Sequence, residues 1–206
     1  IDTHAHVDMD AYDEDRAEVI QRARDNGVEY ILNIGCDIDS SLRSMELAER
    51  YDFIYATAGV HPHDVKNIDN NTYDHLRGLL THPKMIALGE IGLDFYKNYS
   101  PRDLQKEHFR KQAELACELN KPIIVHSRDA SEEIVDILSD YYPKNPSARS
   151  GIFHCFSGNQ KLADRALEMG FYISFSGSVT FKKSDDLRAV AKMVPADRLF
   201  VETDCP

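Results

Sequence analysis

Short apolar runs alternate with amphipathic stretches along the 206 residues of the chain. Eight of the runs are rich in Ile, Val, Phe and Tyr, as is typical of strands buried in a parallel sheet, and they cover residues 1–6, 30–35, 53–58, 85–90, 122–127, 150–154, 171–175 and 199–204. The stretches between them repeat apolar residues with helical spacing at 13–26, 40–51, 72–80, 101–120, 130–141, 160–169 and 184–193. The pattern at 72–80 is the weakest, because it is short and contains Gly78.

This alternation predicts an α/β fold built from βαβ crossovers. We expect a TIM-like (β/α)8 barrel, because closing the sheet leaves no exposed edge. An open, doubly wound sheet is the alternative. No helical pattern follows the last strand, so the prediction is a single domain over residues 1–206 that lacks its last helix and is truncated at the C-terminus.

Composition excludes some classes of function. The formal net charge of −11 disfavours a protein that grips nucleic acid with a broad basic surface, although bound cations can supply positive charge locally. No apolar run approaches the roughly 18 residues of a membrane span, and the chain has no leader pattern. The four cysteines lie far apart, which is typical of reduced thiols. We therefore predict a cytoplasmic protein with no membrane partner, and no protein partner can be inferred.

Ionisable residues recur where the predicted strands end. His4 and His6 lie two apart on the first strand, so their side chains share one face. Four further residues of this kind end or follow other apolar runs: Glu90, His126, His154 and Asp204. In a β/α barrel these ends form one rim, and so many buried ionisable groups are costly unless they are paired or bind metal. The pattern predicts a metal site.

The six residues are enough for two divalent cations. We expect one cation on His4, His6, Glu90 and Asp204 and the other on Glu90, His126 and His154, with Glu90 as the bridge. Imidazole and carboxylate ligands favour zinc, manganese, cobalt or iron over magnesium. Such a pair activates water for hydrolysis, and Asp204 is the predicted catalytic residue, as general base.

Four other residues are candidates for binding substrate or orienting the ligands. His63 follows the third strand, and Arg128 could bind phosphate through two donors. Asp94 and Glu202 could orient the ligand imidazoles. The alternatives are a loop histidine bonded to backbone for His63 and ordinary salt bridges for the other three.

The order of these residues resembles the amidohydrolase superfamily, and the stretches around them resemble the TatD family of metal-dependent deoxyribonucleases. The matching stretches are DTHAH (2–6), GVHPH (59–63), GEIGLD (89–94), VHSR (125–128), FHCFSG (153–158) and ETDCP (202–206). The resemblance implies a TIM-like barrel, a dinuclear site that is usually assigned magnesium, and hydrolysis of DNA from an end. DNA or another phosphodiester is therefore the expected substrate.

Two alternatives stay open. One is an amidohydrolase-type esterase or deacylase, or a phosphotriesterase, on the same metals, because a dinuclear site attacks carbonyl and phosphoryl centres alike. The other is a non-enzymatic barrel that binds metal for structure. A nuclease needs cations and stacking aromatic residues beside the metals, and the candidates are Phe95, Tyr96, Arg128, Phe181, Lys182 and Lys183.

Overall fold

The computed structural model describes residues 1–142 and 150–206, and all eight predicted strands lie in one parallel sheet. Each strand pairs with the next along the chain, which gives the order β1 to β8. The strands are β1 (Asp2–Ala5), β2 (Ile31–Asn33), β3 (Ile54–Ala58), β4 (Met85–Asp94), β5 (Ile123–Arg128), β6 (Gly151–Phe153), β7 (Tyr172–Phe175) and β8 (Leu199–Val201).

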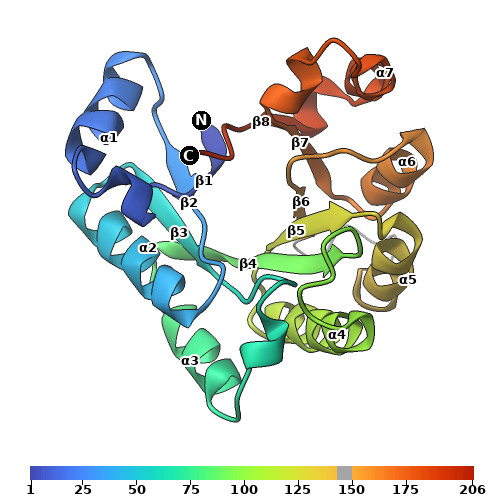
Figure 1. The fold of residues 1–206 in the computed structure, drawn as a ribbon, viewed down its shortest axis with the longest axis horizontal. Coiled ribbons are helices and arrows are strands. Elements are labelled where there is room, and N and C mark those ends of the chain that lie inside the picture. The colour runs from blue at the N-terminus through green and yellow to red at the C-terminus, as the bar shows by residue number, and fades with distance from the viewer. Residues whose placement is uncertain (143–149) are drawn as a thin grey trace.

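The first and last strands meet, so the sheet is a nearly closed barrel. Asp204 N donates to His4 O at 2.9 Å, and His6 N donates to Cys205 O at 3.0 Å. The two ends of the chain accordingly lie side by side between α1 (Arg16–Asp25) and α7 (Asp185–Met193) (Figure 1). A sequential strand order with β1 beside β8 confirms the TIM-like (β/α)8 fold and excludes the doubly wound alternative.

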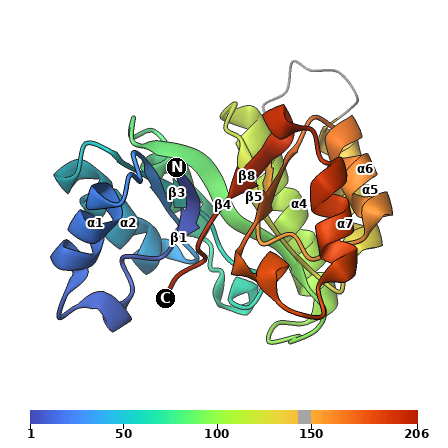
Figure 2. The same cartoon turned by 90° about the horizontal axis from the view of Figure 1, so that it is seen from above.

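One α-helix follows each of the first seven strands in the described residues. Besides α1 and α7 these are α2 (Ile38–Arg50), α3 (Thr72–Leu79), α4 (Arg102–Glu118), α5 (Ser131–Tyr141) and α6 (Gln160–Glu168). In the view from above, the strands lie between α1 and α2 on one side and α5 to α7 on the other (Figure 2). None of these helices has the length and apolar composition needed to cross a membrane, so far as the described residues go.

Local sequence explains where several helices begin and end. Asp37 accepts the N–H of Ser40 at 2.7 Å in a capping box that starts α2. Asn159 caps α6 by accepting the N–H of Leu162 at 3.0 Å. Gly27 follows α1 with a φ of 87°, which an L side chain rarely adopts. The weakly patterned α3 is confirmed, because Leu76 anchors it in the core.

Strand β4 is longer than its sequence pattern predicts. The predicted strand stopped at Glu90, whereas β4 continues to Asp94 and pairs with β5 from Ile91 onward. The strands shift register between Leu88 and Ile91. Gly92 makes the extension possible, since a Cβ there would lie 2.0 Å from His126 O. Glu90 therefore lies within a strand, and β4 brings two carboxylates to the rim.

Candidate metal centre

The barrel interior changes from apolar to ionisable along the strands. A cluster of strand residues (Leu32, Ile34, Ala87 and Ile124, with Ile152 packed against it) fills the interior. Side chains two positions apart on a strand point to the same face. His126 therefore points the same way as Ile124, and His154 the same way as Ile152. The strands thus direct both imidazoles to the carboxyl-end rim, above an apolar floor.

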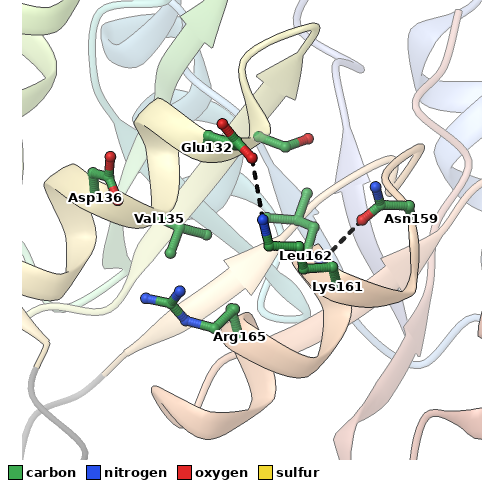
Figure 3. A pocket seen from close by; sticks show the side chains of 8 residues that line it. Glu132, Val135, Asp136, Asn159, Lys161, Leu162 and Arg165 are labelled. Carbon is green, nitrogen blue, oxygen red and sulfur yellow. Dashed lines mark hydrogen bonds and ion pairs between the residues drawn. The ribbon is translucent and has the colours of Figure 1, made fainter.

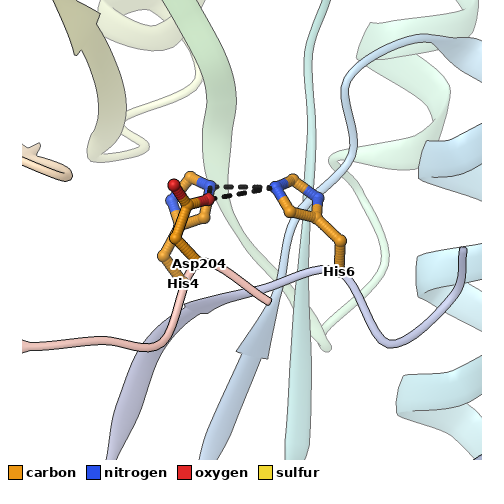
Figure 4. Close-up of side chains that lie close together, drawn as sticks. All are labelled: His4, His6 and Asp204. Carbon is orange, nitrogen blue, oxygen red and sulfur yellow. Dashed lines mark hydrogen bonds and ion pairs between the residues drawn. The ribbon is translucent and has the colours of Figure 1, made fainter. Parts of the chain in front are cut away.

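His4, His6 and Asp204 form one group at this rim (Figure 4). The Nε2 atoms of the two histidines lie 3.2 Å apart. Asp204 Oδ1 lies 3.6 Å from His4 Nε2 and 3.7 Å from His6 Nε2. Asp204 comes from the segment after β8, where its φ is 55°, and its side chain is 35% exposed. The first strand and the last segment of the described chain therefore build this group together.

Glu90, His126 and His154 form a second, more buried group. Glu90 Oε1 lies 2.7 Å from His154 Nε2 and 2.8 Å from His126 Nδ1. The other carboxylate oxygen, Oε2, lies 3.4 Å from His4 Nε2. The carboxylate of Glu90 therefore stands between the two groups, and the six residues expected to bind metal lie in one cluster.

A hydrogen bond at the rear nitrogen of His6 directs its other nitrogen toward the rest of the first group. His6 Nδ1 lies 3.1 Å from the carbonyl oxygen of Ile34, to which only an N–H can donate. Burial opposes protonation of His6, but Asp204 and Glu90 raise its pKa and so favour a proton on Nε2, which faces His4 and Asp204. The Nε2 atoms of His4 and His6, 3.2 Å apart, need either a shared proton or a cation between them.

In the second group, carboxylates lie beside the rear nitrogens of the imidazoles. His126 Nε2 lies 3.3 Å from Asp94 Oδ2, and His154 Nδ1 lies 3.5 Å from Glu202 Oε1. The opposite nitrogen of each ring faces Glu90. Carboxylate–imidazole pairs of this kind orient metal-binding histidines. The donor set and its spacing fit divalent cations. His4, His6 and Asp204 offer three ligand atoms within 4.8 Å of one another, and His126 Nδ1 lies 3.3 Å from His154 Nε2 with Glu90 Oε1 within 2.8 Å of both.

Charge coupling keeps Glu90 ionised. Burial favours its neutral form, but the neighbouring His154 and His61 outweigh burial and hold the pKa of Glu90 well below its usual value. Burial also opposes protonation of His154, but Glu90 and Glu202 raise the pKa of His154 well above its usual value. Without a cation, His154 therefore carries a proton that balances buried negative charge.

In the first group, His4 differs from His154 in its protonation. Burial and the nearby His154 lower the pKa of His4, so this imidazole stays neutral. The neighbouring His6 is the main cause that lowers the pKa of Asp204 to about 2. Asp204 is consequently a carboxylate at neutral pH, on the more open side of the cluster.

The other four candidate residues lie around the cluster. Asp94 Oδ2 is 2.8 Å from His63 Nε2, in addition to its contact with His126. The guanidinium carbon of Arg128 lies 4.1 Å from the centroid of the Tyr96 ring. Glu202 is buried and accepts the backbone N–H of Cys155 at 2.5 Å. Whether His63 and Arg128 contact substrate stays a prediction.

Two residues of the cluster were not among the predicted ligands. His61 Nε2 lies 3.4 Å from Glu90 Oε1, and Cys36 Sγ lies 3.7 Å from Glu90 Oε2. Each follows a strand end, as the predicted ligands do. The signal was available for Cys36, because it lies two positions beyond the interior residue Ile34.

A separate surface pocket lies between α5 and α6 (Figure 3). Its lining contains none of the clustered residues. Lys161 Nζ pairs with Glu132 at 3.1 Å, and Asn159 caps α6. These polar groups are used in holding the helices, so the candidate site is the rim cluster.

Comparisons with known proteins place the chain in a family. The sequence profile described as "TatD related DNase" matches residues 1–206. The chain is 46% identical over 205 residues to the "Uncharacterized metal-dependent hydrolase YabD" of Bacillus subtilis, covering all of this chain and 79% of that protein. It is 37% identical over 206 residues to the "3'-5' ssDNA/RNA exonuclease TatD" of Cronobacter turicensis, covering all of this chain and 77% of that protein.

A solved structure agrees with these matches. The crystal structure of YJJV, a TatD homologue from Escherichia coli, superposes with a TM-score of 0.90 at 30% identity, covering 98% of this chain and 78% of that one. Matches in sequence and in structure both extend over almost the whole chain. The chain therefore belongs to the TatD family of related DNases.

Proposed function

We propose that this chain is a nuclease that hydrolyses phosphodiester bonds of DNA or RNA with two divalent cations. As a TatD family member it is a metal-dependent hydrolase, and relatives 37% identical to it are named 3'-5' ssDNA/RNA exonucleases. The observation that carries the proposal is the position of Glu90, whose two oxygens lie beside different groups of ligand atoms.

The proposed ligand sets follow those two groups. His4, His6, Asp204 and Glu90 Oε2 would hold one cation. His126 Nδ1, His154 Nε2 and Glu90 Oε1 would hold the other. Each set contains two imidazoles, which supports zinc or manganese over magnesium. When bound, the cations lower the pKa of water and polarise the phosphoryl oxygen.

The chain's own residues would supply proton transfer and orientation. Asp204 is ionised and is the most exposed of the six predicted ligands, so we assign it the role of general base toward the attacking water. Asp94 and Glu202 would fix the orientation and tautomer of His126 and His154. His63 and Arg128 would hold the substrate phosphate.

The test separates the nuclease from a carbonyl-directed hydrolase. The protein is stripped with a chelator, single metals are restored, and hydrolysis of single-stranded DNA, a generic phosphodiester and an ester is measured. We expect zinc or manganese to restore cleavage of both phosphodiesters. Cleavage of the ester alone would overturn the nuclease proposal in favour of an esterase or deacylase.

We also propose a cytoplasmic location. The four cysteines are free, as is usual for proteins in reducing compartments. Fractionation of cells that produce the protein would test this, and recovery from an oxidising compartment would contradict it.

A further inference from the structure

Exposed aromatic rings and cations lie together on the loop between β4 and α4. The side chains of Tyr96 and Tyr99 are 59% and 55% exposed. Lys97 Nζ lies 5.8 Å from the centroid of each ring, and Arg128, from the end of β5, lies over Tyr96. We call Tyr96, Lys97, Tyr99 and Arg128 the aromatic platform. It combines ring faces with positive charge in a chain whose net charge is −11.

One carboxylate ties this platform to the metal centre. Asp94 Oδ1 accepts the backbone N–H groups of Tyr96 at 3.0 Å and Lys97 at 2.7 Å. Its other oxygen lies 2.8 Å from His63 and 3.3 Å from the proposed ligand His126. Asp94 is fully buried. Its position therefore fixes the platform relative to the metal centre.

The loop is held from its other side by two further buried residues. Gln105 Oε1 accepts Asp94 N at 2.8 Å, and Gln105 Nε2 donates to Ser100 O at 2.9 Å. Ser100 Oγ donates to the backbone oxygen of His63 at 2.7 Å. A platform held in this way loses little conformational entropy when a ligand binds.

A row of rings leads from the platform to the cluster. The ring centroids of Tyr99 and His63 lie 4.7 Å apart, and those of His63 and His61 lie 4.3 Å apart. His61 and His126 follow at 4.6 Å. A ligand on the platform would therefore lie next to a group bound at the metal centre.

We propose that the aromatic platform binds single-stranded nucleic acid by stacking unpaired bases on Tyr96 and Tyr99, while Lys97 and Arg128 bind the adjacent phosphates. Stacking needs a base with a free face, and bases inside a duplex have both faces covered. Positive charge beside the rings suits a phosphate backbone and not a neutral ester. This inference rests on the proposed nuclease function. It adds a substrate-binding surface beside the proposed metal centre.

The experiment measures binding directly. A short fluorescent single-stranded oligonucleotide with phosphorothioate linkages, which resist hydrolysis, is titrated with the protein as purified and followed by anisotropy. We compare the wild type, Tyr96→Ala with Tyr99→Ala, and Tyr96→Phe with Tyr99→Phe. Tyr30→Ala is the matched control, because Tyr30 is 48% exposed and immediately precedes β2, at the opposite end of the barrel.

We expect the double alanine variant to bind about a hundredfold more weakly, at roughly tenfold for each lost stack. The double phenylalanine variant keeps both ring faces and should stay within about threefold of the wild type. The Tyr30 variant should match the wild type. Metal content and Tm, measured on every variant, show whether the fold and the metal centre are intact.

The possible outcomes separate this inference from the proposed function. Equal affinity of the wild type and the double alanine variant would overturn the platform, even if both cleave DNA. Tyrosine-dependent binding without cleavage by the metal-loaded wild type would overturn the nuclease and leave the platform standing. Failure of the wild type to bind any oligonucleotide, or a preference for blunt duplex over single strands, would overturn the platform.

Discussion

The two halves of the proposed metal centre differ in how firmly the protein holds them. In the closed half, the carboxylate of Glu90 is 5% exposed, and Asp94 and Glu202 stand behind its imidazoles. In the open half, the carboxylate of Asp204 is 35% exposed. The side chains of the closed half are fixed by buried contacts, whereas the open half has a solvent-exposed carboxylate. We expect substitutions in the closed half to change metal affinity and substitutions in the open half to change turnover.

The largest effect should come from Glu90, which belongs to both halves. Glu90→Gln removes the charge shared between the two ligand groups, so metal should be lost and turnover should fall about a thousandfold or more. Metal analysis by mass spectrometry and a nuclease assay check this. Glu46→Gln, at an exposed position of α2, is the control. A full metal complement in Glu90→Gln would contradict the shared position.

Asp204 tests the open half alone. Asp204→Asn keeps an oxygen that can bind a cation but removes the proposed base, so most metal should remain while turnover falls about a hundredfold or more. The same two measurements apply. Unchanged turnover would remove Asp204 from the role of base, and complete loss of metal would make it chiefly a ligand.

The residues behind the closed half should act through the metal. Asp94→Asn and Glu202→Gln should each weaken metal binding about tenfold to a hundredfold, because the imidazoles lose their orienting carboxylates. Competition with a chromophoric chelator measures this affinity. Glu114→Gln, at an exposed position of α4, is the control. If both variants bind metal as the wild type does, the two halves do not differ as we propose.

The smallest effect should appear in the pH dependence of metal binding. Burial opposes protonation of His154, but Glu90 and Glu202 raise its pKa, so a cation must displace a proton there. His4, whose pKa burial lowers, has no proton to lose at neutral pH. The pKa values of His126, in the closed half, and His6, in the open half, are also raised, against the effect of burial, by their carboxylate neighbours. Metal affinity should therefore rise at least about tenfold per pH unit up to the raised pKa values and level off above them. Calorimetry in two buffers counts the released protons, and an absence of proton release would contradict this.

The raised pKa of His154 also determines how the stability of the metal-free protein changes with pH. A pKa of His154 that is higher in the folded chain stabilises the fold fully below the ordinary histidine pKa. That contribution is lost as pH rises through the raised value. The contribution of Glu90 to stability changes with pH in the opposite direction. Because its pKa is lowered, Glu90 stabilises the fold above the ordinary glutamate pKa, and this contribution is lost on acidification.

Most of the fold and the convergence of the six residues could be predicted from the sequence. Strand runs with helical stretches between them determine the barrel, and barrel topology brings strand ends together. The extension of β4 could not be predicted, because a charged residue after an apolar run normally marks a strand end. Only the close approach of β5 at Gly92 shows that the strand continues.

Local sequence patterns also do not predict how many contacts the residues behind the proposed ligands make. Asp94 bonds His63, His126 and the backbone of Tyr96 at once, and that number of partners depends on a register shift with no local signature. His61 and Cys36 reach Glu90 because of loop geometry after β3 and β2. Alternation along a strand predicts which way each side chain points. Contacts made by loop residues can be identified only from the three-dimensional structure.

The seam between β1 and β8 would give the proposed cations a structural role. Two backbone hydrogen bonds and the bond from Thr203 Oγ1 to Asp2 Oδ2 join the last residues to the first strand. A cation held by His4, His6 and Asp204 would bridge this seam, so occupancy and barrel closure would be thermodynamically linked. Resistance of residues 199–206 to proteolysis should then rise with metal concentration, and it would report saturation without any substrate.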